Sequence, residues 1–150
     1  MERMETRNRI IGLLSGTGRP GMDNVISFLK ESNFFSAQCH RHHKYPGGLA
    51  AHSLEAYHAA SRWNGPLPDD SLRIVCLLHD ICSSRGAGSN GIHGHGRRSV
   101  AILEDVCHLE LKPEERDAIL LHMHPFTLAS RGNRLGTTLC RADSWSASRG

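Results

Sequence analysis

Histidine and aspartate are the side chains in this sequence whose types and positions could support chemistry. The chain has 11 histidines among 150 residues, and the stretch LLHDIC places His79 beside Asp80 at the end of an apolar run. A buried carboxylate without a partner is unfavourable, so a neighbouring cation would explain the aspartate. Six residues are candidate metal ligands: His52, His79, Asp80, His95, His122 and Asp143.

The chemistry of this set is that of a metal site. Imidazole nitrogen together with carboxylate oxygen favours a divalent transition metal such as iron, manganese, nickel, cobalt or zinc. A single histidine on a helix is more often a surface or hydrogen-bonded core residue than a ligand. The ordered set of six residues is therefore the evidence, rather than any one member of it.

The elements that position these residues are predicted to be helices. The segment SLRIVCLLHDIC is apolar around nearly its whole circumference, which predicts the buried central helix. Its N-cap is expected at Asp69, Asp70 or Ser71. His95 is expected in the glycine-rich loop before the next helix. Helices are expected over residues 3–14, 49–63, 97–109, 113–123 and about 136–146, and within the segments 21–35 and 71–82.

No segment shows the alternation of apolar and polar residues that is typical of a strand. The expected fold class is all-α, a helical bundle of about six or seven helices. Its length fits one domain, in which residues 1–20 form an N-terminal helix and turn, and residues 21–150 form the core.

Composition excludes several classes of protein. The chain is 39% hydrophobic and 22% charged, as in globular proteins, and its net charge of +3 is too small for a duplex nucleic-acid binder. It has neither an apolar run long enough to span a membrane nor a secretory signal. The five cysteines include no C-x-x-C pair. A cytoplasmic protein is expected.

Five segments in the same order resemble the HD-domain superfamily. HHKYPGGLAAHSLEAY is similar to that family's HHxYxGGLxxHSLxV, and LLHDIC to its His-Asp dipeptide. GHGRRSVAIL resembles GHxxxSxxIL, AILLHMH resembles IxxHH, and CRADSWSA resembles xxADxxSA. The resemblance runs from about residue 20 to the end of the chain and implies a helical, HD-domain-like fold.

The resemblance implies a metal-dependent phosphohydrolase that cleaves a nucleotide or another small phosphate ester with a metal-activated water. The positions that match the family's ligands for one metal are His52, His79, Asp80 and Asp143. In binuclear members, positions matching His95 and His122 hold a second metal, with Asp80 as the bridge. In the one-metal case, His95 and His122 would contact the phosphate or protonate the leaving oxygen, so Asp80, His95 and His122 are the expected catalytic residues.

The substrate side carries less information. Expected phosphate contacts are His42, His43, Lys44, Arg97 and Arg98, although a solvated position explains each of them as well. Many relatives have HDxGK, whereas this chain has HDICS, without the lysine. The expected partner is a small phosphorylated molecule, in particular a nucleotide, and a homo-oligomer is compatible with the sequence.

Two other functions use the same residues. A few relatives in this superfamily are di-iron oxygenases, and a six-ligand histidine and aspartate set is compatible with that activity. A non-catalytic module that senses a nucleotide is the other alternative, although it would not need all six residues. A nuclease is less favoured, because only 5% of the residues are aromatic and a stacking platform for bases is not evident.

Overall fold

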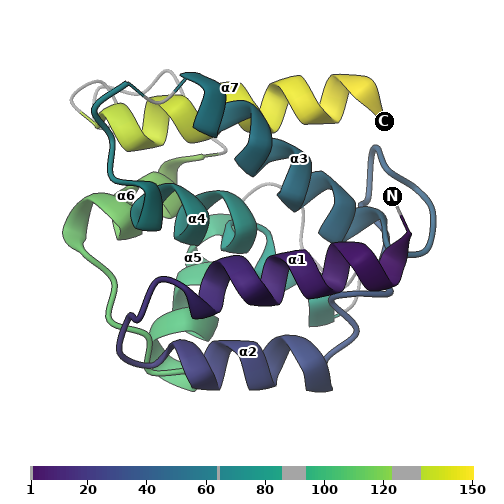
Figure 1. Ribbon diagram of the computed structural model, residues 1–150, viewed down its shortest axis with the longest axis horizontal. Coiled ribbons are helices and arrows are strands. Elements are labelled where there is room, and N and C mark those ends of the chain that lie inside the picture. The colour runs from purple at the N-terminus through teal and green to yellow at the C-terminus, as the bar shows by residue number, and fades with distance from the viewer. Residues whose placement is uncertain (1, 64, 86–93, 123–132) are drawn as a thin grey trace.

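The computed structural model describes residues 2–63, 65–85, 94–122 and 133–150, and these residues form helices without any strand (Figure 1). The all-α prediction is therefore confirmed. None of the described helices has the length and apolar composition needed to cross a bilayer. The described residues contain seven α-helices: α1 (Arg3–Ser15), α2 (Met22–Glu31), α3 (Gly48–Trp63), α4 (Asp69–Leu78), α5 (His95–Ala101), α6 (Pro113–Leu121) and α7 (Arg134–Arg149).

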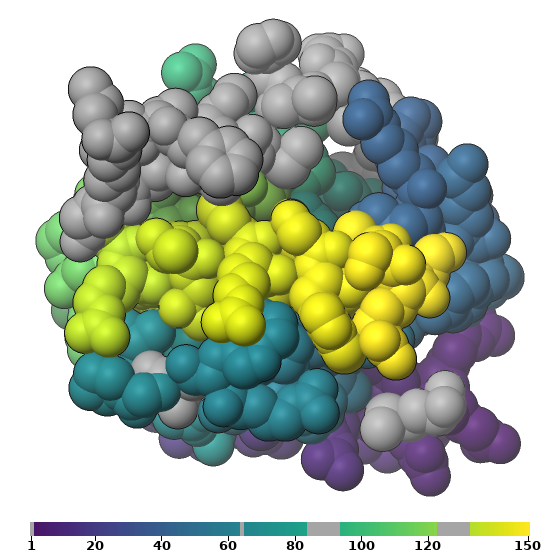
Figure 2. Space-filling model, turned by 90° about the horizontal axis from the view of Figure 1, so that it is seen from above, coloured from purple at the N-terminus to yellow at the C-terminus, as the bar shows by residue number. Residues whose placement is uncertain are grey.

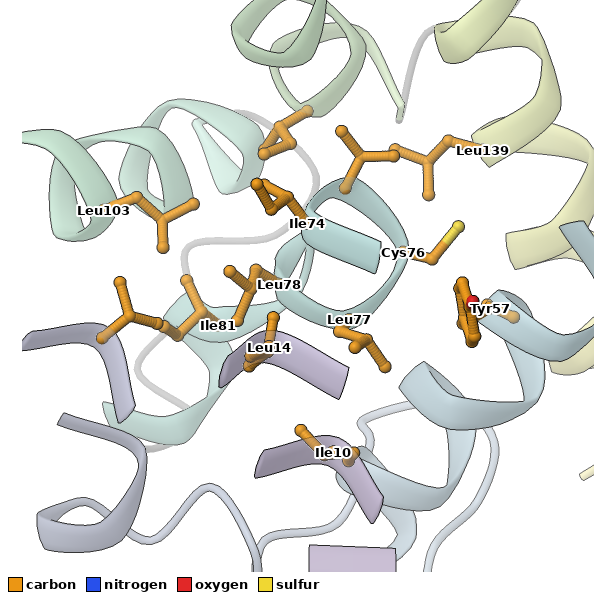
Figure 3. Packing of buried hydrophobic residues seen from close by; sticks show 14 of the residues in the cluster. Ile10, Leu14, Tyr57, Ile74, Cys76, Leu77, Leu78, Ile81, Leu103 and Leu139 are labelled. Carbon is orange, nitrogen blue, oxygen red and sulfur yellow. The ribbon is translucent and has the colours of Figure 1, made fainter. Parts of the chain in front are cut away.

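Helix α4 lies at the centre of the hydrophobic core, as its apolar sequence predicts. It contacts α1, α3, α6 and α7, and Ile74 and Leu77 point toward side chains of the surrounding helices (Figure 3). Each fully buried leucine or isoleucine contributes about 1.5–3 kcal/mol relative to an exposed one. The residues of α4 without solvent exposure are Leu72, Ile74, Val75, Cys76, Leu77 and Leu78. Packing of α4 in the core therefore fixes the position of its C-terminal end, which His79 directly follows.

Helices α3 and α7 form the most extensive helix pair in the molecule. Three alanines of α3, at positions 56, 59 and 60, are fully buried, and side chains of this size allow close helix contacts. Figure 2 shows α7 in yellow along one face of the molecule. This pair brings residues that are about 90 positions apart in sequence, such as His52 and Asp143, into contact.

Glycine is required where the loop before α3 meets the start of that helix. A Cβ atom on Gly48 would overlap the carbonyl oxygen of His43, and Gly47 has a φ of 88°, in the left-handed region. The two adjacent glycines of the PGG segment therefore let His43 pack directly against the first turn of α3. This packing leaves the His43 ring buried beside the helix that carries His52.

A buried ion pair fastens the segment between α1 and α2 to the rest of the bundle. The Arg19 guanidinium donates to both carboxylate oxygens of Glu115, at 2.6 and 2.9 Å, and to Asp70 at 3.1 Å. The Ser71 hydroxyl also donates to Glu115, at 2.6 Å. Burial opposes ionisation of Glu115, but the hydrogen bonds from Arg19, Ser71 and the Lys112 backbone, together with the charge of Arg19, outweigh this and lower the pKa of the carboxyl. The ion pair joins this segment to α4 and α6.

Four predicted helix boundaries were wrong, and one of them is the end of the helix expected over 97–109, because helical backbone stops at Val106. Helix α4 has Pro68 as its N-cap, because the side chains of residues 69–71 bond to Tyr57, Arg19 and Glu115 instead. Helix α5 already begins at His95, after Gly94 with a φ of 83°, so His95 is not a loop residue, and a π-helical turn, Ile102–Val106, continues it. Helix α7 is longer than expected, since Asn133 caps its start by accepting from the backbone N–H of Gly136.

Candidate metal centre

The structure brings the six candidate ligands together from five separate segments. His52 lies in α3, His79 and Asp80 follow α4, His95 begins α5, His122 ends α6, and Asp143 lies in α7. Their nitrogen and oxygen atoms form two groups, and within each group these atoms lie within 4.8 Å of one another. The two groups are His52, His79, Asp80 and Asp143, and Asp80, His95 and His122. Asp80 belongs to both.

Asp80 lies between the two groups and turns one carboxylate oxygen toward each. Its Oδ1 is 2.5 Å from Nε2 of His95 and 3.5 Å from Nε2 of His122. Its Oδ2 is 3.1 Å from Nε2 of His79 and 3.5 Å from Nε2 of His52. This is the arrangement that a carboxylate shared by two cations requires.

Asp143 completes the first group. Its Oδ1 is 2.8 Å from Nε2 of His52 and 3.3 Å from Nε2 of His79. Nε2 of each of these two histidines is therefore within 3.5 Å of both carboxylates.

All four histidines present Nε2 to the centre and use Nδ1 elsewhere. Nδ1 of His79 lies 2.9 Å from the carbonyl oxygen of Cys76, and Nδ1 of His122 lies 2.6 Å from that of Ile119. A carbonyl oxygen only accepts, so both Nδ1 atoms carry a proton. Nε2 of these rings is thus the nitrogen whose lone pair is available to a metal.

The other two rings have side-chain partners at Nδ1. Nδ1 of His52 lies 2.9 Å from the hydroxyl oxygen of Ser146, and Nδ1 of His95 lies 3.3 Å from the thiol sulfur of Cys82. Both partners can accept a hydrogen bond from the ring N–H. Each ring orientation is thus fixed from behind, as is usual for histidines that bind metals.

Burial makes the cluster electrostatically costly without a cation. Burial disfavours protonation of His79, but the Asp80 and Asp143 carboxylates outweigh it and raise the pKa of the imidazole well above its ordinary value. The same competition raises the pKa of His95 to about 10, with Asp80 as its main carboxylate partner. In the metal-free protein, protons on His79 and His95 therefore offset the negative charge of the two carboxylates.

The residues fit a divalent transition metal. Nε2 of His122 is buried and has no hydrogen-bond partner within the described residues, although it lies 3.5 Å from Asp80. A cation between these two atoms would satisfy a nitrogen that otherwise stays unpaired. The mixed nitrogen and oxygen donors suit iron, manganese, nickel, cobalt or zinc.

The five predicted substrate contacts differ in their positions. The rings of His42 and His43 lie beside His52, with centroids 4.5 and 5.3 Å from its ring. One guanidinium nitrogen of Arg98 is buried and has no partner in the described ranges. Lys44 and Arg97 are exposed. The structure thus brings only the two histidines of this set directly to the cluster.

The residues that hydrogen-bond the candidate ligands at Nδ1, or support those partners, were not predicted from the sequence. Cys82 stands where the HDxGK pattern has glycine, and Ser146 is the serine of the segment similar to ADxxSA, so both were visible as motif positions. Glu55, which accepts from Ser146 at 2.9 Å, occupies a variable position of the motif that contains His52 and carries no signal in the sequence. Contacts of this kind depend on the approach of α3 to α7.

Comparison with protein families agrees with the geometry. Residues 49–148 match the HD domain, and this range contains all six clustered residues. The chain therefore belongs to the HD-domain family, as the five sequence segments predict. Comparison with curated proteins gives no match, and comparison with solved structures gives none.

Proposed function

We propose that this protein is a metal-dependent phosphohydrolase that acts on a nucleotide or another small phosphate ester. The observation that supports the proposal most is the convergence of four Nε2 atoms and two carboxylates on one buried site, with Asp80 between its two halves. Membership of the HD-domain family supports the same reaction class.

The proposal assigns two sets of ligands. His52, His79, Asp80 and Asp143 would hold one cation, and Asp80, His95 and His122 would hold a second. A bound cation would lower the pKa of a water molecule toward 7 and offset negative charge on the phosphate. Asp80 would keep the two positions at a fixed separation, because each of its oxygens faces a different group.

The histidines of the second group have another role if only one cation binds. His95 has a pKa of about 10 in the metal-free protein, so its ring carries a proton at neutral pH. It could donate that proton to the leaving oxygen, and His122 could hydrogen-bond the phosphate. These roles match Asp80, His95 and His122 as the catalytic residues of the proposal.

The substrate contacts of the proposal are His42, His43, Lys44, Arg97 and Arg98. His42 and His43 are supported by their position beside His52. Arg98 is supported by its unpaired buried nitrogen, which a phosphate oxygen would satisfy. Lys44 and Arg97 remain predictions from the sequence, since both are exposed.

The test is a screen for phosphate release. Purified protein is loaded in turn with manganese, iron, nickel, cobalt or zinc and incubated with a panel of nucleotides and other phosphate esters. Asp80→Ala is the blank, and Asp105→Ala, a change at an exposed aspartate, is the matched control. Release by the wild type and the control but not by Asp80→Ala is expected, whereas full activity in Asp80→Ala would contradict the proposal.

Two other outcomes would assign the alternatives. Consumption of dioxygen by the iron-loaded protein, without phosphate release from any ester, would identify an oxygenase. Tight nucleotide binding without turnover under every metal would identify a sensing module. Both outcomes would overturn the phosphohydrolase proposal while leaving the metal centre intact.

A further inference from the structure

Glu55 contacts two parts of the site, Ser146 behind His52 and the His42–His43 pair. It lies one helical turn after His52 on α3, and its side chain is 42% exposed. Its Oε1 nevertheless accepts from two groups of the site, the Ser146 hydroxyl at 2.9 Å and Nε2 of His43 at 3.0 Å. Two donors from different segments therefore hold this partly exposed carboxylate.

The first branch runs from Glu55 to a candidate metal ligand. Nε2 of His52 faces the carboxylates, so Nδ1 keeps its proton and donates a hydrogen bond to the Ser146 oxygen at 2.9 Å. The Ser146 hydroxyl then donates to Glu55 at 2.9 Å, since its other acceptor, the carbonyl oxygen of His52, is farther away at 3.4 Å. The chain of hydrogen bonds behind His52 therefore ends on a negative charge.

The second branch runs from Glu55 to the pair of histidines beside the site. Since a carboxylate only accepts, Nε2 of His43 carries the proton of this bond, and Nδ1 of His43 is left to accept from Nδ1 of His42 at 2.7 Å. His43 is buried, and its φ of 45° is unusual for a residue other than glycine. Its contact with Glu55 helps to hold this conformation.

We propose that Glu55 is a positioning residue of the metal centre, which fixes His52 through Ser146 and fixes the His42–His43 pair directly. This inference rests on the proposed function. A carboxylate behind a ligating histidine fixes the ring and raises the basicity of the ligand, and its loss typically weakens metal binding by about 10- to 100-fold. Nδ1 of His79, His95 and His122 bonds to a carbonyl oxygen or a thiol instead.

Cobalt titration of the metal-free protein, followed by visible absorbance, tests the first branch. Glu55→Ala and Ser146→Ala are each expected to weaken cobalt binding by about 10- to 100-fold. Glu55→Gln, which keeps an oxygen acceptor at the same reach, is expected to lose less. Glu31→Ala is the matched control, because Glu31 is exposed on α2 and has no described partner.

Inorganic phosphate binding to the cobalt-loaded proteins tests the second branch. Glu55→Ala is expected to weaken phosphate binding, since it also releases His43 and His42. Ser146→Ala, compared at saturating cobalt, is expected to weaken phosphate binding less than Glu55→Ala does, because it breaks only the link to His52. Equal loss of phosphate binding in both variants would overturn the direct link from Glu55 to the histidine pair.

Three results separate the possible failures. Wild-type cobalt affinity in Glu55→Ala would overturn the positioning role alone. Metal-free Glu55→Ala could also have a lower Tm than the metal-free wild type. If this loss of stability accounts for the weaker cobalt binding, Glu55 has a structural role, and the positioning role is overturned. Absence of a cobalt spectrum in the wild type would overturn the metal centre, and the inference with it.

Discussion

At the scale of single residues, Asp80 is the one member of the cluster that belongs to both groups of candidate ligands. It lies within 3.5 Å of Nε2 of all four histidines. The sequence predicts this bridging role only through family resemblance, because His-Asp dipeptides occur in many proteins. The shared use of Nε2 could not be predicted, since it depends on backbone carbonyl groups such as that of Cys76.

Cys82 gives a prediction for the second group of ligands. Its sulfur is 3.3 Å from Nδ1 of His95 and holds that ring with Nε2 toward Asp80. Cys82→Ala is expected to weaken binding of the second cation by about tenfold while leaving the first unchanged, and Cys82→Ser is expected to restore much of the loss. Calorimetric titration with manganese measures both. Equal weakening of both cations in Cys82→Ala would contradict this assignment.

At the scale of elements, the second group depends on the close approach of α5 to α6. A Cβ atom on Gly96 would lie 2.5 Å from the carbonyl oxygen of Ile119 and 2.8 Å from that of Leu120. The ring centroids of His95 and His122, which these helices carry, are 5.4 Å apart. The glycine directly after His95 therefore sets the distance between the two histidines.

Gly96→Ala tests this contact. The added methyl group is expected to push α5 from α6 and destabilise the protein by about 1–3 kcal/mol, with weaker binding of the second cation. Urea unfolding and manganese titration measure the two effects. Gly12→Ala is the control, since a Cβ atom there meets nothing within 4 Å. Wild-type stability in Gly96→Ala would show that the two helices are not in tight contact at this position.

Elements were easier to predict from the sequence than their ends. The helical spacing and composition of α3 and α4 predict both helices and the burial of α4, because these properties are local. The start of α5 at His95 was missed, since it depends on the left-handed conformation of Gly94. The N-cap of α4 was missed because tertiary partners occupy the polar side chains at its start.

At the scale of the whole molecule, the site joins helices that are distant in sequence into one charged centre inside the core. Family resemblance predicted which residues meet there, and the structure places them together. Family resemblance could not predict the ion pair of Arg19 with Glu115, because neither residue belongs to a family motif. The expected cytoplasmic location and the division into residues 1–20 and 21–150 stay predictions.

The charged centre makes the stability of the metal-free protein depend on pH. His52, His79 and His95 have raised pKa values, about 10 for His95, so their stabilising contribution is complete below the unfolded value of about 6.5 and is lost as pH rises. The carboxylates have lowered pKa values and lose their contribution only in acid. The Tm of the chelator-treated protein is therefore expected to fall between about pH 6 and about pH 9.

A bound cation reverses this trend. Cations replace the protons on Nε2, so metal binding releases protons and strengthens as pH rises. The Tm of the cobalt-saturated protein is thus expected to exceed that of the metal-free protein by more at about pH 9 than at about pH 6. Calorimetric scans of both forms measure the difference. A metal-free Tm that rises over this interval would contradict the assigned charges.

Anomalous diffraction from zinc-loaded crystals tests the central claim, the metal centre itself, most directly. The account predicts a zinc peak about 2.0–2.1 Å from Nε2 of His52 and His79, with a second peak near His95 and His122 if two ions bind. Asp80 is expected to contact each ion. Zinc peaks elsewhere on the protein, with none inside the cluster, would contradict the account.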